Sequence, residues 1–127
     1  MSRASTRATA DCGSTSLTTV LLTPVFLVIA LMAFQAALWS HARTEARVLA
    51  RNGAALVARS HADSAATEQA TLAMLRSDTD IRDARVVIVV SGDVVQARIT
   101  GRAPGVIRGT SSGVDVTEAV PREGFRP

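Results

Sequence analysis

The sequence contains no lysine, no tyrosine and only one cysteine, Cys12. A single cysteine cannot form an intrachain disulfide, and Cys12 precedes the long apolar run, whereas a lipoprotein cysteine would follow one. Aromatic residues make up only 3% of the chain, and the net charge is only +3. Nucleic-acid surfaces combine basic side chains with aromatic stacking partners. We therefore expect no nucleic-acid partner.

The residue patterns of common catalytic and metal sites are also missing. The histidines His41 and His61 lie far apart in the sequence, and the acidic cluster 78–83 lacks the central glycine and closing glutamate of a calcium loop. No glycine-rich phosphate loop followed by lysine is present, and there is no nucleophile elbow. We expect a protein that is not an enzyme and that holds no cofactor or metal.

One long apolar run is present, at Leu17–Leu38. It contains no charged residue, and its polar side chains are Thr18, Thr19, Thr23 and Gln35. As a helix it would be ~33 Å long, enough to cross a hydrocarbon core of ~30 Å. The run therefore predicts a membrane helix. Gln35 would either gain from a hydrogen-bonding neighbour or lie close enough to the interface to reach water.

The composition on either side of this run divides the chain into five segments. A short polar leader precedes the span, and helices, a β region and a tail follow it. The predicted boundaries are 1–16 for the leader, 17–39 for the transmembrane helix, 40–76 for the helical extension and a second helix, 77–120 for a small antiparallel β region, and 121–127 for the tail.

Small residues recur at nearly every fourth position from the end of the span onward, and no proline interrupts the helix between Ser40 and Ser60. Such spacing lets another backbone approach closely. The stripe either packs on the chain's own domain or contacts a partner helix. Its members are Ala33, Ala37, Ala42, Ala46, Ala50, Gly53 and Ala54.

A second helix is predicted to begin at an N-cap at Asp63 or Ser64 and to end near Arg76. Its apolar side would consist of Ala65, Ala66, Leu72, Ala73 and Leu75.

The apolar period changes to that of strands after Ile81. The run at 85–90 is apolar on both faces and predicts an inner strand. A turn at 91–93 leads to a return strand in which Val95, Ala97 and Ile99 share one face. A third strand is predicted at 114–120. The fold class is therefore α+β, with a long N-terminal transmembrane helix extending into an amphipathic helix, a second short helix, and an antiparallel sheet of about three strands.

The start of the chain resembles the amino-terminal signature of TadE-like pilus assembly proteins. The resemblance rests on residues 13–17, GSTSL, and 20–27, VLLTPVFL, which combine a glycine, a short polar run and an apolar helix with an early proline. The helix beyond Trp39, the second helix and the strands are also similar to that family.

This resemblance implies a minor pilin or pseudopilin of pilus assembly or tight-adherence secretion. A prepilin peptidase would cut between Gly13 and Ser14, the partners would be the membrane and other pilin-like or TadE-like subunits, and the soluble part would lie outside the cytoplasm. The family usually has a glutamate at the fifth residue after the glycine, where this chain has Thr18. That departure favours an accessory or membrane-resident member over a bulk fibre subunit.

Other interpretations remain open at this stage. One is an unprocessed single-pass membrane protein with a small structural or binding module unrelated to pili. Arg43, Arg47 and Arg51 outnumber Arg3 and Arg7, which favours a cytoplasmic C-terminal side. Another is a secreted soluble domain that is released by cleavage of a signal peptide at Ala42.

Overall fold

The computed structural model describes residues 11–122 and 124; the first ten residues of the predicted leader, and residues 123 and 125–127 of the predicted tail, lie outside this range. The elements are α1 (Asp11–Ser60), α2 (Ser64–Asp78), β1 (Arg82–Ser91), β2 (Val94–Ala103) and β3 (Ser112–Pro121). They confirm the predicted α+β class. The chain forms two compact units, Met1–Phe34 and Gln35–Pro127, and α1 contributes to both.

Helix α1 begins at Asp11, so residues 11–16, which the sequence assigned to a polar leader, are helical. Pro24 lies inside the helix and cannot donate a backbone hydrogen bond to the preceding turn. The apolar side chains of residues 17–34 are mostly exposed, with Leu27 at 70%. Helix α1 is long and apolar enough to cross a membrane, and the apolar window is not buried inside the protein.

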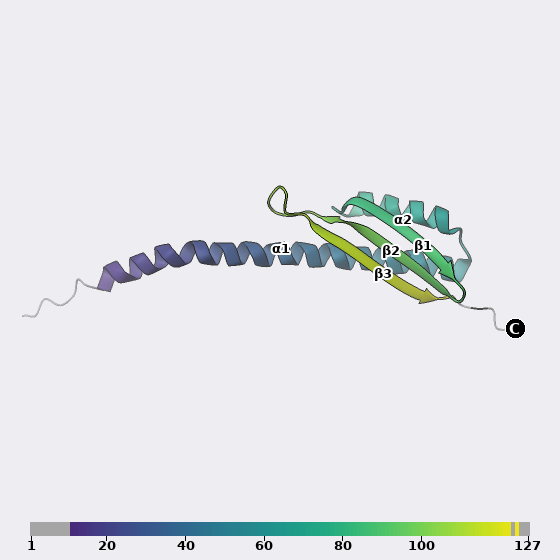
Figure 1. Ribbon diagram of the computed structural model, residues 1–127, viewed down its shortest axis with the longest axis horizontal. Helices are drawn as coiled ribbons and strands as arrows, with labels where there is room; N and C mark the ends of the chain where they lie inside the picture. The colour runs from purple at the N-terminus through teal and green to yellow at the C-terminus, as the bar shows by residue number, and fades with distance from the viewer. Residues whose placement is uncertain (1–10, 123, 125–127) are drawn as a thin grey trace, which may run out of the picture. The chain divides into compact units, whose positions relative to one another are not determined.

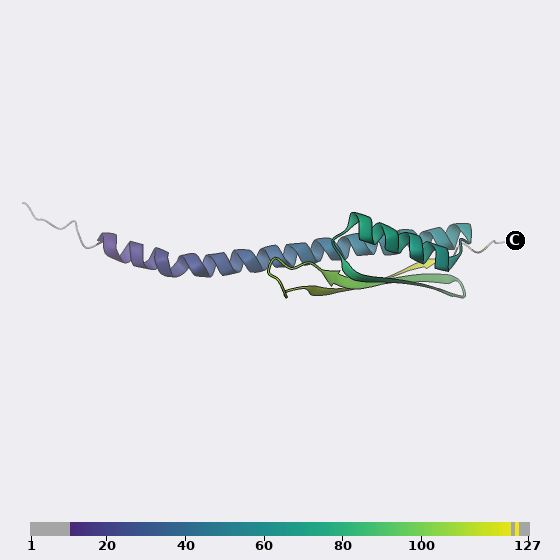
Figure 2. The ribbon, with the colours of Figure 1, turned by 90° about the horizontal axis from the view of Figure 1, so that it is seen from above.

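In the second unit, the three strands form one antiparallel sheet in the order β1-β2-β3. Helix α2 and the C-terminal part of α1 pack on the same face of this sheet, as the two views in Figures 1 and 2 show. The core between these two layers combines alanines from α1 with alternate apolar residues from the strands.

The strand pattern confirms the predicted alternation. Val95, Ala97 and Ile99 of β2 are buried, and Val114 and Val116 of β3 are buried beside them. The β1–β2 turn is Gly92–Asp93, and Gly92 has φ +56, in the first turn position, where type II′ hairpins place glycine.

The prediction that residues 85–90 form an inner strand is wrong, because β1 is an edge strand and β2 is central. The second apolar face of β1 is exposed at Val87 and Val89. Helix α2 lies against β1, and the Glu68 carboxylate accepts a hydrogen bond of 2.6 Å from the Ile88 backbone N–H. This continuous apolar run thus forms an edge strand with one exposed face. It is not hydrogen-bonded to a neighbouring strand on both sides.

Of the two predicted N-cap candidates, Asp63 is the N-cap of α2, and its side chain accepts a hydrogen bond from the Ala66 N–H at 3.2 Å. The predicted apolar face of α2 is confirmed at Leu75, which is buried, and Leu72 is partly buried against the core. It is wrong at the alanines, and the other buried residues of the helix are Thr67 and Thr71. The Thr67 hydroxyl donates to the Asp63 carbonyl at 2.9 Å, which satisfies its polar atom and lets the residue be buried. Ala65, Ala66 and Ala73 are exposed.

A β-bulge interrupts the pairing of β1 with β2. Arg82 pairs with Arg102 and Arg85 with Thr100, so two residues of β1 face Gly101 alone. Asp83, inside the bulge, has φ +52. A Cβ on Gly101 would lie 2.5 Å from the Ile81 side chain, so this approach of the two strands requires glycine.

Candidate functional site

The structure divides the predicted small-residue stripe into two parts. Ala42, Ala46, Ala50, Gly53 and Ala54 are buried, and the alanines among them belong to the core formed with the sheet. The remaining two members, Ala33 and Ala37, are exposed. The chain's own second unit thus covers the C-terminal part of the stripe.

Gly53 of α1 lies where α1 and α2 come close together. A Cβ at this position would lie 3.1 Å from the Thr71 hydroxyl and 3.6 Å from Ile88 Cδ1. Because the missing side chain makes room for both α2 and β1, Gly53 serves packing inside the protein.

Sequence reasoning missed a different surface, a shallow apolar groove between α1 and α2. It has a volume of about 190 Å³, and its walls include Leu49, Leu56, Ala70 and Met74. Leu56 and Met74 are each about half exposed. The spacing of these residues in the sequence does not predict the groove, because the groove exists only once α2 has folded back along α1.

The loop 104–111, between β2 and β3, is hydrogen-bonded to α1 at the end of the apolar run. Gln35 donates through Nε2 to Thr110 Oγ1 at 3.0 Å and accepts from the Val106 N–H at 3.2 Å. Trp39 Nε1 donates to the Gly113 carbonyl at 3.0 Å. Of the two alternatives for Gln35, the structure shows the hydrogen-bonding neighbour.

Charged groups of the second unit pair across its surface. Arg47 of α1 lies 3.2 Å from Glu118 of β3, and Arg98 makes a two-pronged contact with Asp115 at 3.0 and 2.5 Å. The hydrogen bonds from Arg98 hold the pKa of Asp115 below its usual range. Both side chains are solvent-exposed, so water screens this pair.

The predicted processing residues Gly13 and Ser14 lie in the first turns of α1. The match to a known family begins at this point: the family model of TadE-like protein covers residues 13–55. Residues 13–55, called below the TadE-like segment, are therefore similar to this family. The match confirms the resemblance over residues 13–55, and it does not extend to the second helix and the strands.

The TadE-like segment includes the apolar run and every member of the small-residue stripe. It ends before α2 and the sheet, so the residues that cover the stripe lie outside the matched range. No curated protein and no solved structure matches the chain.

Proposed function

We propose that this chain is a non-enzymatic, single-pass membrane protein that acts as a minor pilin, pseudopilin or accessory factor in pilus assembly or tight-adherence secretion. The observation that carries the proposal is the TadE-like match, which begins at Gly13 and continues through the apolar half of α1. In this proposal a prepilin peptidase cuts between Gly13 and Ser14. The apolar helix remains on the mature protein, and the soluble unit lies outside the cytoplasm.

Packing inside the second unit limits which surfaces a partner subunit can use. Ala46, Ala50 and Ala54 are fully buried by the chain's own elements. Contacts with other pilin-like or TadE-like subunits therefore involve the exposed small residues Ala33 and Ala37 in the membrane, where small side chains favour close helix packing. Outside the membrane, the groove beside Leu56 and Met74 offers apolar surface.

Thr18 supports the accessory role within this proposal. In a fibre shaft, a carboxylate at this position would be paired with the free amine of a neighbouring subunit, because a buried charge is stable only when it is paired. Threonine cannot form that ion pair. We therefore expect the protein to remain membrane-resident or to enter assemblies as a minor component.

Intact-mass measurement and N-terminal sequencing of the full chain, extracted from membranes of cells that contain a prepilin peptidase, test the proposal. A mature chain beginning at Ser14 supports it. The Gly13→Val variant should keep its leader, whereas the matched Ser16→Val variant should still be cut. A chain that begins near Thr44 would show an ordinary secretory signal and refute the proposal.

The alternative is an unprocessed membrane protein with a binding module unrelated to pili. The arginines Arg43, Arg47 and Arg51 beyond the apolar run favour it, because positive charge concentrates on the cytoplasmic side. An uncut N-terminus, together with a C-terminal reporter that is active only in the cytoplasm, would support this alternative.

A further inference from the structure

The loop 104–111 combines exposed apolar side chains with nearby arginines, and the proposed assembly role does not account for this combination. We propose that this loop and the arginine-lined hollow at its base form a contact surface for the phosphate headgroups of the bilayer that α1 enters. This inference rests on the part of the proposed function that keeps the apolar helix on the protein. It does not depend on cleavage at Gly13 or on any pilus partner.

The first argument is the level of the loop along α1. Gln35 holds the loop by its two hydrogen bonds, and Gln35 lies inside the apolar run, which ends three residues later at Leu38. At ~1.5 Å per residue, the loop is fixed within ~5 Å of the end of the run. Trp39 binds the start of β3 at the same level, and tryptophan is favoured at membrane interfaces.

The second argument is the composition of the loop tip. Val106 and Ile107 are neighbours and are 45% and 52% exposed, although the rest of the loop consists of proline, glycine and polar residues. The Ile107 carbonyl accepts hydrogen bonds from the Thr110 N–H at 3.1 Å and the Thr110 hydroxyl at 2.7 Å. The turn thus satisfies part of its own backbone and presents two aliphatic side chains outward, which suits the boundary between headgroups and acyl chains.

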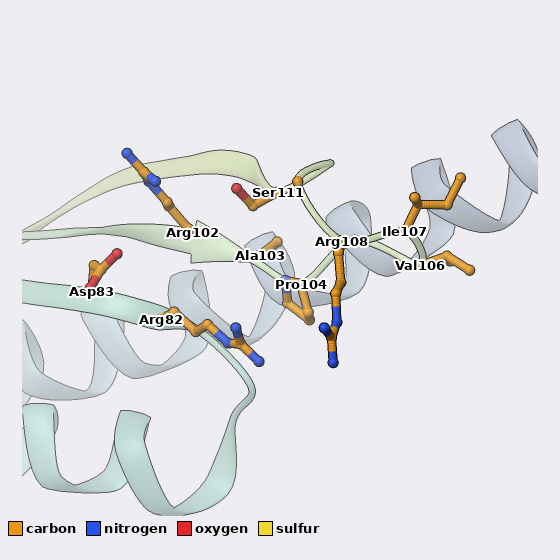
Figure 3. Close-up of a pocket in the computed structure, with 11 residues that line it drawn as sticks. Arg82, Asp83, Arg102, Ala103, Pro104, Val106, Ile107, Arg108 and Ser111 are labelled. Carbon is orange, nitrogen blue, oxygen red and sulfur yellow. The ribbon is translucent and has the colours of Figure 1, made fainter.

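The third argument is the charge beside the tip. A hollow of about 310 Å³ is lined by Arg82, Arg102 and Arg108, with Asp83 as its one acidic residue. Figure 3 shows the guanidinium groups of Arg82 and Arg108 extending to the same side of the loop, whereas Arg102 points away from them. Within residues 11–122, none of these three arginines forms an ion pair.

The backbone fixes this arrangement. The bulge at Asp83 places Arg82 opposite Arg102 at the end of the sheet, and bulges commonly redirect side chains in this way. Gly105 lies so close to Thr110 that a Cβ there would clash with the Thr110 backbone. The planar guanidinium group of arginine matches phosphate oxygens in geometry and charge. The apolar tip next to unpaired arginines is therefore complementary to a phospholipid surface, and a soluble anion would leave the tip unexplained.

The test uses the full chain with Cys12→Ser, so that one introduced cysteine can be labelled. An environment-sensitive fluorophore is attached at Ile107→Cys, or at Val89→Cys as a control on the exposed face of the sheet. The protein is reconstituted in vesicles of phosphatidylcholine with phosphatidylglycerol. We expect lipids with a headgroup-proximal quencher to reduce emission from the label at position 107 severalfold more than that at 89. Equal quenching at both positions, with equal access to aqueous iodide, would overturn the proposal.

A second arm tests the arginines. Replacing phosphatidylglycerol with phosphatidylcholine should weaken the lipid quenching at position 107, and the pair Arg82→Gln and Arg108→Gln should remove that lipid dependence. The matched pair Arg51→Gln and Arg85→Gln, which removes two exposed arginines outside the hollow, should preserve it. Circular dichroism of each variant verifies the fold. If both pairs behave alike, the hollow has no role in lipid binding.

Inorganic phosphate, added against chloride at equal ionic strength, distinguishes the two sources of the anion. An unchanged signal at position 107 supports the headgroup surface, and displacement of the label into water would assign the hollow to a soluble anion and refute the proposal. Mass measurement of the same sample distinguishes failure of this inference from failure of the proposed function. A water-exposed loop on a chain that retains the apolar run refutes this inference alone, whereas loss of the run refutes the proposed function.

Discussion

The two halves of α1 form one helix but have opposite surfaces. In residues 17–34 the large apolar side chains are exposed, such as Phe26 at 66% and Leu27 at 70%. In residues 42–58 the small side chains are buried, with Ala46 and Ala50 at 0%. Large side chains without a protein partner indicate a helix whose solvent is lipid. Small buried ones indicate a helix that its own sheet approaches closely.

One continuous helix can therefore present large apolar side chains to lipid in its first half and small side chains to its own sheet in its second half. The change between them occurs where Gln35 and Trp39 bind the loop and the start of β3. The protein marks the end of its apolar run with side-chain hydrogen bonds and not with a break in the helix.

The largest expected effect comes from a charge in the first half. Leu27→Arg should reduce membrane insertion, at a cost of about 3 kcal/mol for arginine in place of leucine near a helix centre. Leu56→Arg, at an exposed position of the same helix, should leave insertion unchanged. The measurement is the fraction of full chain that resists alkaline carbonate extraction. Equal extraction of both variants would show that lipid does not surround the first half.

The next effect concerns crowding in the second half. Ala50→Leu inserts three carbon atoms into a fully buried position and should destabilise the second unit by about 1–3 kcal/mol. Ala37→Leu, on the exposed part of the stripe, is the matched control and should cost far less. Urea unfolding in detergent, followed by circular dichroism, measures both. A similar midpoint for the two variants would contradict the packing described here.

A smaller effect should appear at the boundary between the halves. Trp39→Phe retains an aromatic ring but removes the donor to the Gly113 carbonyl, a bond worth roughly 0.5–1.5 kcal/mol. We expect faster amide exchange in residues 104–113 and no change in residues 17–30. Phe34→Leu provides the control outside this hydrogen bond. Unchanged exchange in the loop after Trp39→Phe would indicate that Gln35 alone fixes it.

The smallest effect is a pH dependence confined to the charged second unit. Arg98 lowers the pKa of Asp115 from its ordinary value of 3.8. The folded protein thus binds this proton less readily than the unfolded chain, so the pair stabilises the fold above that ordinary value and loses its effect as pH falls through the lowered pKa.

The variant Asp115→Asn tests this sign. It should lower the melting temperature slightly at neutral pH and match the unmodified protein in strong acid. Asp93→Asn, which alters an exposed residue of the hairpin turn, should not show the same convergence. A gap between Asp115→Asn and the unmodified protein that widens in acid would contradict the ion pair.

Local patterns were sufficient to predict much of this fold. The alternation at Val95, Ala97 and Ile99 identified the buried face of β2, and the side chain of Asp63 identified the start of α2. Both features depend on residues close together in the sequence, where period and capping chemistry act directly.

The errors arose where distant segments meet. The run at 85–90 predicted an inner strand, but β1 lies at the edge of the sheet and its second apolar face, with Val87 and Val89, is exposed. The inward face of α2 contains Thr67 and Thr71 beside Leu75, and the apolar pattern of the sequence does not predict the two threonines. The Thr67 hydroxyl is compatible with burial because it donates to the Asp63 carbonyl. The loop contacts of Gln35 join residues far apart in the sequence, and no local pattern predicts such a pairing.

The hydrogen bond from Ile88 to Glu68 has a further consequence for the edge of the sheet. An apolar β edge such as 85–90 can pair with the same segment of another copy and begin an aggregate. Because Glu68 occupies the outward N–H of Ile88 at 2.6 Å, an approaching strand meets a carboxylate in place of a free donor. A single side chain from α2 therefore protects this position of the exposed edge.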